Sequence, residues 1–226
     1  RDIHEQAPKY VAHINEAFRL IHRYCPDEYE MYLQSTSRIV LYEKENIRSF
    51  VTRNVHGTIF ISVNAASNTP FFIEELVHQC SHNVFNAITA EVRDYLKVAP
   101  ATPMSALNGN ERDIRDIFGA YHGVYTVSTG VNSLLPMVLS QELEESMHLE
   151  LLGRLAIKRP RFRTGIQLLD FDAVYTEKGK ELYHFLDQRC IEQMERHPEI
   201  FNIFDFSNQR TVFSLQRFLE ANQLAI

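Results

Sequence analysis

The stretch "EELVHQCSHNVFNAI", Glu74 to Ile88, decides how the rest of this 226-residue chain is interpreted. Apolar residues recur in it at helical spacing, and "NTP", residues 68–70, marks a turn shortly before it. These signals predict a helix from about residue 71 to 96. His78 and His82 stand four residues apart on one face of this helix, where their ring nitrogens can converge on one metal ion.

The residue that follows the first histidine argues against a peptidase. Zinc peptidases with an H-E-x-x-H helix use the Glu to deprotonate the metal-bound water. Here that position is Gln79, whose amide can orient a water, a cosubstrate or a substrate group but cannot take the proton. Gln79 is therefore a candidate catalytic residue with an orienting role, and hydrolysis is disfavoured by its chemistry.

A third ligand is expected in "ERDIRDIFGAYHGVYTVST", residues 111–129, where a second helix is predicted to begin near residue 111. Arg115, Gly119 and His122 then share one helical face, while Ile114 and Ile117 point elsewhere. Gly inside a helix costs about 1 kcal/mol relative to Ala, so either a ligand or a neighbouring helix approaches the backbone there. His122 is the preferred third ligand, and Glu145 or His148 on a later helix are the alternatives.

The surrounding segments predict a helix-dominated α+β domain with a small sheet before the metal-binding helix, which carries the His pair as zincin helices do. Residues 8–25 place most of their apolar side chains on one stripe of a helix, namely Val11, Ile14, Phe18, Leu20 and Ile21. Short runs rich in Val, Ile, Phe and Thr predict an antiparallel or mixed sheet from residues 37–45, 49–54 and 57–64. The chain is divided into an N-terminal helix and sheet (1–70), the metal-binding helices (71–130) and a helical C-terminal lobe (131–226), all within one domain, 1–226.

Helices are also expected in residues 131–157, as two helices or one bent at Pro136, and in residues 176–201, opened by a Thr176 cap. The basic run "GRLAIKRPRFR", residues 153–163, has two interpretations. It is a solvated loop after a helix, or it contacts an acidic substrate or leader segment. Glu142, Glu144 and Glu145 are expected to form a solvated or salt-bridged face.

Composition narrows the class of protein. With 23 basic and 29 acidic residues, the formal charge of −6 argues against general nucleic-acid binding, which needs a basic face. The three cysteines Cys25, Cys80 and Cys190 form no C-x-x-C pair and suggest a reducing compartment, with Cys80 as a core thiol. No apolar run approaches 18 residues and no signal-peptide pattern appears, so a cytoplasmic protein without a membrane span is expected.

Two segments, "GTIFISV…FFIEELVHQCSHNVFNAI" and "DIRDIFGAYHGVYTV", resemble the α-ketoglutarate-dependent HExxH-type peptide β-hydroxylases, a family of peptide-modification proteins from ribosomal-peptide pathways. The resemblance covers roughly residues 58–130. Gln79 replaces the Glu of the family motif, and Asp116 stands where Pro is common. The matching positions are His78, His82, Asn86, Asp113, Arg115, Gly119, His122 and Gly123.

This resemblance implies an iron- and α-ketoglutarate-dependent oxygenase that uses O2 to hydroxylate, at a β-carbon, a residue of a peptide or carrier-bound substrate in natural product biosynthesis. His78, His82 and His122 would bind Fe(II), and Arg115, Gly119 and Asn86 would serve the cosubstrate. A planar guanidinium suits the distal carboxylate of α-ketoglutarate, which favours Arg115 for that contact. Two alternatives stay open: a zinc metallohydrolase with the same ligands, and a non-catalytic member that binds a peptide or partner.

Overall fold

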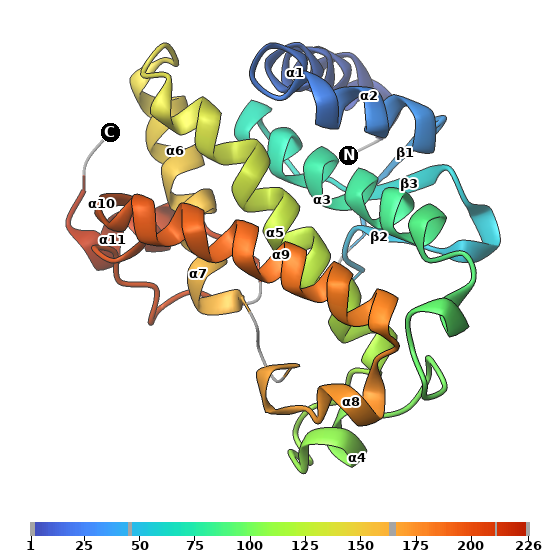
Figure 1. The fold of residues 1–226 in the computed structure, drawn as a ribbon. Helices are drawn as coiled ribbons and strands as arrows, with labels where there is room; N and C mark the ends of the chain where they lie inside the picture. The colour runs from blue at the N-terminus through green and yellow to red at the C-terminus, as the bar shows by residue number, and fades with distance from the viewer. Residues whose placement is uncertain (1–2, 45–46, 163–165, 211, 225–226) are drawn as a thin grey trace.

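Two long helices, α3 (Thr69–Ile88) and α5 (Ile117–Leu139), cross the middle of the molecule side by side. The computed structural model describes residues 3–44, 47–162, 166–210 and 212–224. In Figure 1, α1 (Ile3–Tyr24) and α2 (Pro26–Ser35) lie above α3, and α9 (Glu177–Arg196) crosses in front of α5. The remaining helices are α4 Met104–Asn108, α6 Glu145–Ala156, α7 Lys158–Arg161, α8 Phe171–Val174, α10 Pro198–Phe201 and α11 Leu215–Asn222, with 3-10 turns at Arg53–Val55, Val92–Asp94 and Ile166–Leu168.

The small sheet is mixed, which is one of the two forms that the sequence predicts. Strand β3 (Thr58–Ser62) lies between β1 (Arg38–Tyr42), which runs parallel to it, and β2 (Phe50–Val51), which runs antiparallel. Ile59 and Ile61 of β3 are completely buried, and the strand packs against α3. The prediction of a helix-dominated α+β fold is confirmed at this level.

Helix α3 begins where predicted and ends earlier than predicted. The side chain of Asn68 accepts a hydrogen bond from the Phe71 backbone N–H, which caps the first turn. At the other end, both the N–H and the hydroxyl of Thr89 donate to the Phe85 carbonyl. The predicted continuation to residue 96 is therefore wrong, because the chain turns at Thr89 and re-forms only the short 3-10 turn Val92–Asp94.

Helix α5 begins six residues after the predicted start near residue 111. Asp116 is its N-cap and accepts a hydrogen bond from the Gly119 N–H at 2.6 Å. Arg115 therefore precedes the helix, and so does Ile114, which the spacing predicts on another face of the helix and which is 95% exposed. The helix continues through Pro136 to Leu139, and the break before α6 falls at residues 140–144.

The helices predicted for residues 8–25 and 176–201 are mostly confirmed. Helix α1 buries Ile14 and Ile21, but Val11, expected on the same stripe, is 49% exposed. Thr176 caps α9 by accepting a hydrogen bond from the Gly179 N–H. The three cysteines are buried, and none of them forms a disulfide with another described cysteine.

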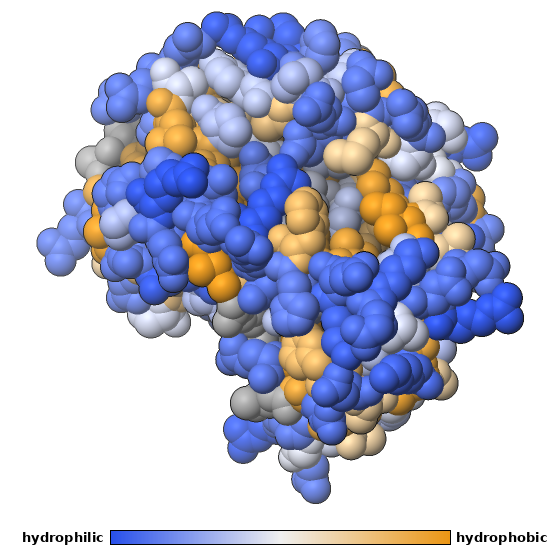
Figure 2. All heavy atoms as spheres, viewed as in Figure 1, coloured by the Kyte–Doolittle hydropathy of each residue, from blue (hydrophilic) through white to orange (hydrophobic). Residues whose placement is uncertain are grey.

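The surface in Figure 2 is largely hydrophilic, and hydrophobic residues appear on this face only in small separate patches. Scattered apolar residues of this kind are normal on folded proteins. Within the described ranges, no helix combines the length and the apolarity that crossing a bilayer requires.

Gly179 fixes how closely the first turn of α9 approaches the chain after α3. A Cβ placed on Gly179 would lie 2.0 Å from the Tyr95 carbonyl oxygen. We expect Gly179→Ala to lower the free energy of unfolding by about 1–3 kcal/mol or more, because backbone must shift to admit the methyl group. Urea denaturation measures this change.

Gly123→Ala is the matched control, because a Cβ at Gly123 in α5 would meet no atom within 4 Å. Its expected effect lies between zero and a gain of about 1 kcal/mol from helix propensity. Equal stability of the two variants would contradict the close approach at Gly179.

Candidate metal and substrate site

Three imidazoles meet where α3 packs against α5. His82 Nε2 lies 3.2 Å from His78 Nε2, and His82 Nδ1 lies 2.7 Å from His122 Nδ1. The first contact joins successive turns of α3, as the spacing predicts. The second joins two helices whose residues are 40 positions apart, so it depends on tertiary packing.

Aromatic rings surround the buried end of this cluster. The ring centroids of Phe85 and Phe118 lie 4.4 Å and 4.7 Å from that of His122, each nearly edge-on. Burial lowers the pKa of His82 to about 4 and, with the neighbouring His82, that of His122 to about 3. Burial likewise lowers the pKa of His78 well below its usual value. All three imidazoles are therefore neutral at pH 7, the form in which histidine binds metals.

The three rings have the donor type, the protonation state and the proximity that a metal site requires, but their nitrogen atoms do not point to one common position. His82 directs Nε2 at His78 and Nδ1 at His122, and two nitrogens of one ring cannot bind one ion. Accordingly, no group of three or more His, Cys, Asp or Glu side chains in the described part of the chain is arranged to hold a metal. Ligand nitrogens about 2.0–2.1 Å from zinc stand roughly 3 Å apart, so the Nε2 atoms of His78 and His82 already have a suitable separation.

Gln79 is held by a neighbouring carboxyl group. Its Nε2 donates to Glu75 Oε2 at 3.3 Å, and its Oε1 is buried without a hydrogen-bond partner among the described residues. Burial raises the pKa of Glu75, and the nearby Glu74 carboxylate adds to the shift. Gln79 thus presents an amide oxygen as an acceptor for a donor that the described protein atoms do not supply.

The residues expected to serve a cosubstrate lie in different surroundings. Arg115 donates from Nε and Nη2 to the two carboxylate oxygens of Asp113, at 2.8 and 2.7 Å. Asn86 is buried one turn after His82, and within the described residues its Oδ1 has no partner. Gly119 has a local structural explanation: a Cβ there would lie 3.0 Å from the capping oxygen of Asp116.

A cavity of about 1010 Å³ opens beside the His cluster. His78, Gln79 and Arg115 line it, whereas His82, His122, Asn86 and Gly119 lie outside its lining. Of the three imidazoles, His78 therefore connects the cluster with the cavity. The wall also contains residues of the β1–β2 connection, of α6 and α7, and of the segment before α11.

A buried ionic network forms part of this wall. Arg154 donates to Glu74 Oε2 at 2.7 Å and to Glu150 Oε1 at 2.6 Å, and Lys158 binds the other oxygen of Glu74. Asn68 Nδ2 donates to Glu150 Oε2 at 2.7 Å, which joins the cap of α3 to the same network. Burial alone would raise the pKa of Glu74, but Lys158 and Arg154 hold it well below its usual range.

Only part of this network was predictable from the amino-acid sequence. The interpretation as a solvated loop is wrong for residues 153–161, because Arg154 and Lys158 are 7% and 5% exposed on helices that line the cavity, and Arg163 lies outside the described residues. Glu74 lies one helical turn before His78, and this spacing from a candidate metal ligand could have identified Glu74 as a residue near the site. The acidic face, in contrast, behaves as predicted: Glu142 is exposed and paired with Arg23.

No protein-family model matches this chain, and no curated protein matches it. Its function is therefore inferred from its own residues and their geometry.

Replacing the central carboxylate of the network tests its contribution. We expect Glu74→Gln to lower the free energy of unfolding at pH 7 by about 3–5 kcal/mol, because it leaves buried positive charge without its counter-charge. Glu142→Gln, in an exposed ion pair, is the control and should cost at most about 1 kcal/mol. Urea denaturation of both variants supplies the comparison.

The same pair of variants has a predicted pH dependence. Because the folded-state pKa of Glu74 is lowered from 4.5, its stabilising effect is present above that pH and is lost as the pH falls below it. The stability difference between the parent and Glu74→Gln should therefore shrink below about pH 4.5. A difference that stays constant down to pH 3 would contradict an ionised Glu74.

Proposed function

We propose that the chain is a mononuclear iron- and α-ketoglutarate-dependent oxygenase that hydroxylates, at a β-carbon, a residue of a peptide or peptide-bound substrate. The observation that carries the proposal is the contact of three neutral imidazoles from α3 and α5 beside a cavity of about 1010 Å³. The resemblance of residues 58–130 to peptide β-hydroxylases supplies the reaction class.

The residues that would hold the metal are His78, His82 and His122. Three neutral nitrogen ligands leave Fe(II) with its full positive charge, which a dianionic keto acid can balance. When bound, iron and α-ketoglutarate supply the oxidising chemistry with O2, and the protein positions the carbon to be hydroxylated. The aromatic rings of Phe85 and Phe118 keep water from the buried side of the imidazoles.

Gln79 has an orienting role in this proposal. Its amide has no basic group, and Glu75 fixes its NH2 so that the carbonyl oxygen is left as an acceptor. A hydrogen bond from a bound ligand would satisfy this oxygen and set the position of the ligand near His78. Hydrolysis requires a base that removes a proton from water, and Gln79 cannot act as that base.

Arg115 is the proposed anchor of the distal carboxylate of α-ketoglutarate. It lines the cavity with His78, and Asp113 holds its guanidinium in a fixed orientation. Arg154 lines the same cavity, but its side chain is only 8% exposed and is held by Glu74 and Glu150. The Arg115 side chain is 36% exposed, so it is the more accessible of the two to an additional carboxylate.

Metal binding tests the ligand assignment. Each of His78→Ala, His82→Ala and His122→Ala should lower the iron content severalfold after anaerobic loading, because each removes one of three ligands. Elemental analysis of the folded variants gives the measurement, with His184→Ala as the control. Normal iron content in His122→Ala together with loss in Glu145→Gln or His148→Ala would show that the third ligand has been assigned wrongly.

The reaction class is tested on the same iron-loaded protein. Succinate should form from α-ketoglutarate only when O2 is present, and the three His variants should form none. If the zinc-loaded protein instead hydrolyses peptides, and Gln79→Ala abolishes that hydrolysis, the chain is a hydrolase and the proposal fails.

Arg115 variants test the cosubstrate contact. Arg115→Lys keeps the charge but loses the planar fork, so α-ketoglutarate should bind roughly tenfold more weakly while iron still binds. Arg115→Gln should weaken binding further. Titration of the anaerobic iron form, followed by its visible charge-transfer band, measures the affinity.

The matched control for Arg115 is Arg112→Gln, an exposed residue that precedes it by three positions and lies outside the cavity lining. Its affinity for α-ketoglutarate should equal that of the parent. Unchanged affinity in folded Arg115→Gln, with a loss in Arg154→Gln, would transfer the anchoring role to Arg154.

A further inference from the structure

The C-terminal part of the chain forms a unit with its own hydrogen bonds. We define the C-terminal cover as the described residues from Asp205 to Asn222, which include helix α11. At its two ends, Asn222 Oδ1 accepts from the Asp205 N–H at 2.8 Å, and Asn222 Nδ2 donates to the Asp205 carbonyl at 3.0 Å. The side chain of Gln209 makes the same pair of contacts with the backbone of Ser214, at 2.9 and 3.1 Å. These bonds fasten α11 to the loop that precedes it.

The cover also has its own aromatic centre. Phe218 is completely buried, and the ring centroids of Phe206 and Phe213 lie 5.6 and 5.8 Å from that of Phe218. Phe213, Phe218 and Ile157, the residue that follows α6, form a hydrophobic cluster distinct from the main core, and the partly buried Phe206 contacts both. Displacing the cover therefore leaves the main core of the molecule largely in place.

Helix α6 provides a surface without a side chain where the cover docks. A Cβ placed on Gly153 would lie 2.8 Å from Phe213 Cζ and 2.9 Å from Phe218 Cδ1 and Cε1. Both rings therefore rest directly on the backbone of α6, and any larger residue at this position would obstruct them. The Phe213 ring also covers Arg154, whose Cζ lies 5.0 Å from the ring centroid. The docked cover thus shields one face of a guanidinium in the buried ionic network.

The cover forms part of the wall of the large cavity. Val212 and Phe213 line this cavity together with His78 and Val127. Val212 is 60% exposed and Phe213 is 7% exposed, so the cover extends from the solvent-exposed rim of the cavity to its buried wall. Because His78 is the one imidazole of the cluster that lines the cavity, a ligand reaches the cluster through this space. Movement of the cover would widen that route.

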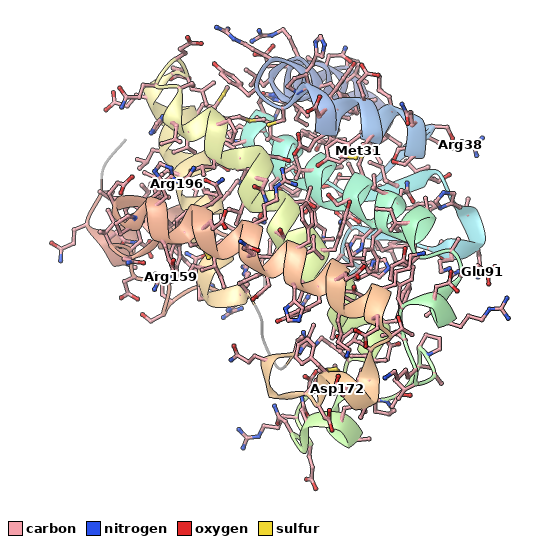
Figure 3. The ribbon with its side chains drawn as sticks, in the orientation of Figure 1. Met31, Arg38, Glu91, Arg159, Asp172 and Arg196 are labelled. Atoms are coloured by element: carbon pink, nitrogen blue, oxygen red, sulfur yellow. The ribbon has the colours of Figure 1, made fainter. Side chains whose placement is uncertain are left out.

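The chain immediately before the cover is fixed to the body of the molecule. Ile200 and Phe201 of α10 are each 5% exposed and belong to the main core. Arg159, labelled in Figure 3, donates from Nη1 to the Phe201 carbonyl at 3.3 Å. Asn202 and Ile203 follow outside any helix or strand, and Ile203 is 63% exposed. A short exposed connection between two such parts is where a hinge disturbs the fewest contacts.

We infer that the C-terminal cover is a lid: it swings as one unit about Asn202 and Ile203, leaves α6 and opens the cavity beside His78. The cover keeps its internal hydrogen bonds in this movement. It gives up the packing of its aromatic rings on α6 and the 3.5 Å hydrogen bond from Arg161 Nη2 to the Arg210 carbonyl. This inference goes beyond the proposed function, since it concerns access to the cavity whatever reaction takes place there.

Thiol labelling tests whether the cover limits access to the cavity. Val127→Cys places a thiol on the part of the cavity wall that α5 contributes, and Glu142→Cys places one at an exposed position outside the lining. The native cysteines give little background, because all three are buried, and burial raises the thiol pKa of Cys25 and Cys80 to about 12. A bulky maleimide should react with Val127→Cys at least about tenfold more slowly than with Glu142→Cys.

Gly153→Ala displaces the cover, because its Cβ would overlap the rings that rest on α6. It should accelerate the labelling of Val127→Cys by roughly tenfold, as expected for an overpacked contact, and leave that of Glu142→Cys unchanged. Gly123→Ala is the matched control, since a Cβ there meets no atom within 4 Å, and it should change neither rate. Phe218→Leu weakens the docking from outside the cavity lining and should accelerate labelling severalfold, which keeps the inference testable if Gly153→Ala fails to fold.

Hydrogen exchange distinguishes movement of the whole cover from its unfolding. In Gly153→Ala, the α11 amides should keep the protection of the parent within about twofold, because their hydrogen bonds stay inside the cover. Three results would overturn the inference: equal labelling of Val127→Cys and Glu142→Cys, labelling that folded Gly153→Ala leaves unchanged, or loss of α11 protection in step with faster labelling. Neither measurement uses iron, α-ketoglutarate or a substrate, so failure of this inference can be distinguished from failure of the proposed reaction.

Discussion

The structure is organised around a constraint on α3: a helix packed against α1, α2, α5, α6 and β3 must find partners for its own polar side chains. Buried polar groups without partners are costly, and buried charges even more so. Glu74 meets this demand through Arg154 and Lys158, and the amide NH2 of Asn83 meets it by donating to the Thr36 hydroxyl. These contacts determine where α6, α7 and the end of α2 lie against α3.

Some of the buried polar atoms that remain without a partner belong to residues near the candidate site. Within the described residues, the side-chain oxygens of Gln79 and Asn86 are buried and accept no hydrogen bond, as is also true of the Asn83 oxygen. Gln79 lines the cavity, and Asn86 lies one turn beyond His82. Helix α3 thus combines a fully satisfied ionic anchor at Glu74 with unsatisfied acceptors around its histidines, as expected where binding groups are kept available for a ligand.

Helix capping explains why periodicity misplaced the start of α5. The face that relates Arg115, Gly119 and His122 exists only if all three belong to one helix. Asp116 instead caps the helix through the Gly119 N–H, and this leaves Arg115 in the preceding segment, where Asp113 holds it. Arg115 nevertheless lines the same cavity as His78, because the loop before α5, and not the helix itself, places it there.

Local sequence by itself determined the start of α3, the pairing of His78 with His82 on one face and the Thr176 cap, since each depends on residues only a few positions apart. It predicted a small sheet but left open whether the sheet is antiparallel or mixed, because Arg38 of β1 pairs with the distant Thr58 of β3. It also made His122 a candidate partner, but the contact itself spans 40 residues and needs α5 packed on α3. The burial of Arg154 and Lys158 against Glu74 spans 80 and 84 residues, and a basic run carries no local sign of the carboxylate that will neutralise it. Spacing fixes which residues share a helical face, whereas only tertiary packing decides what that face meets.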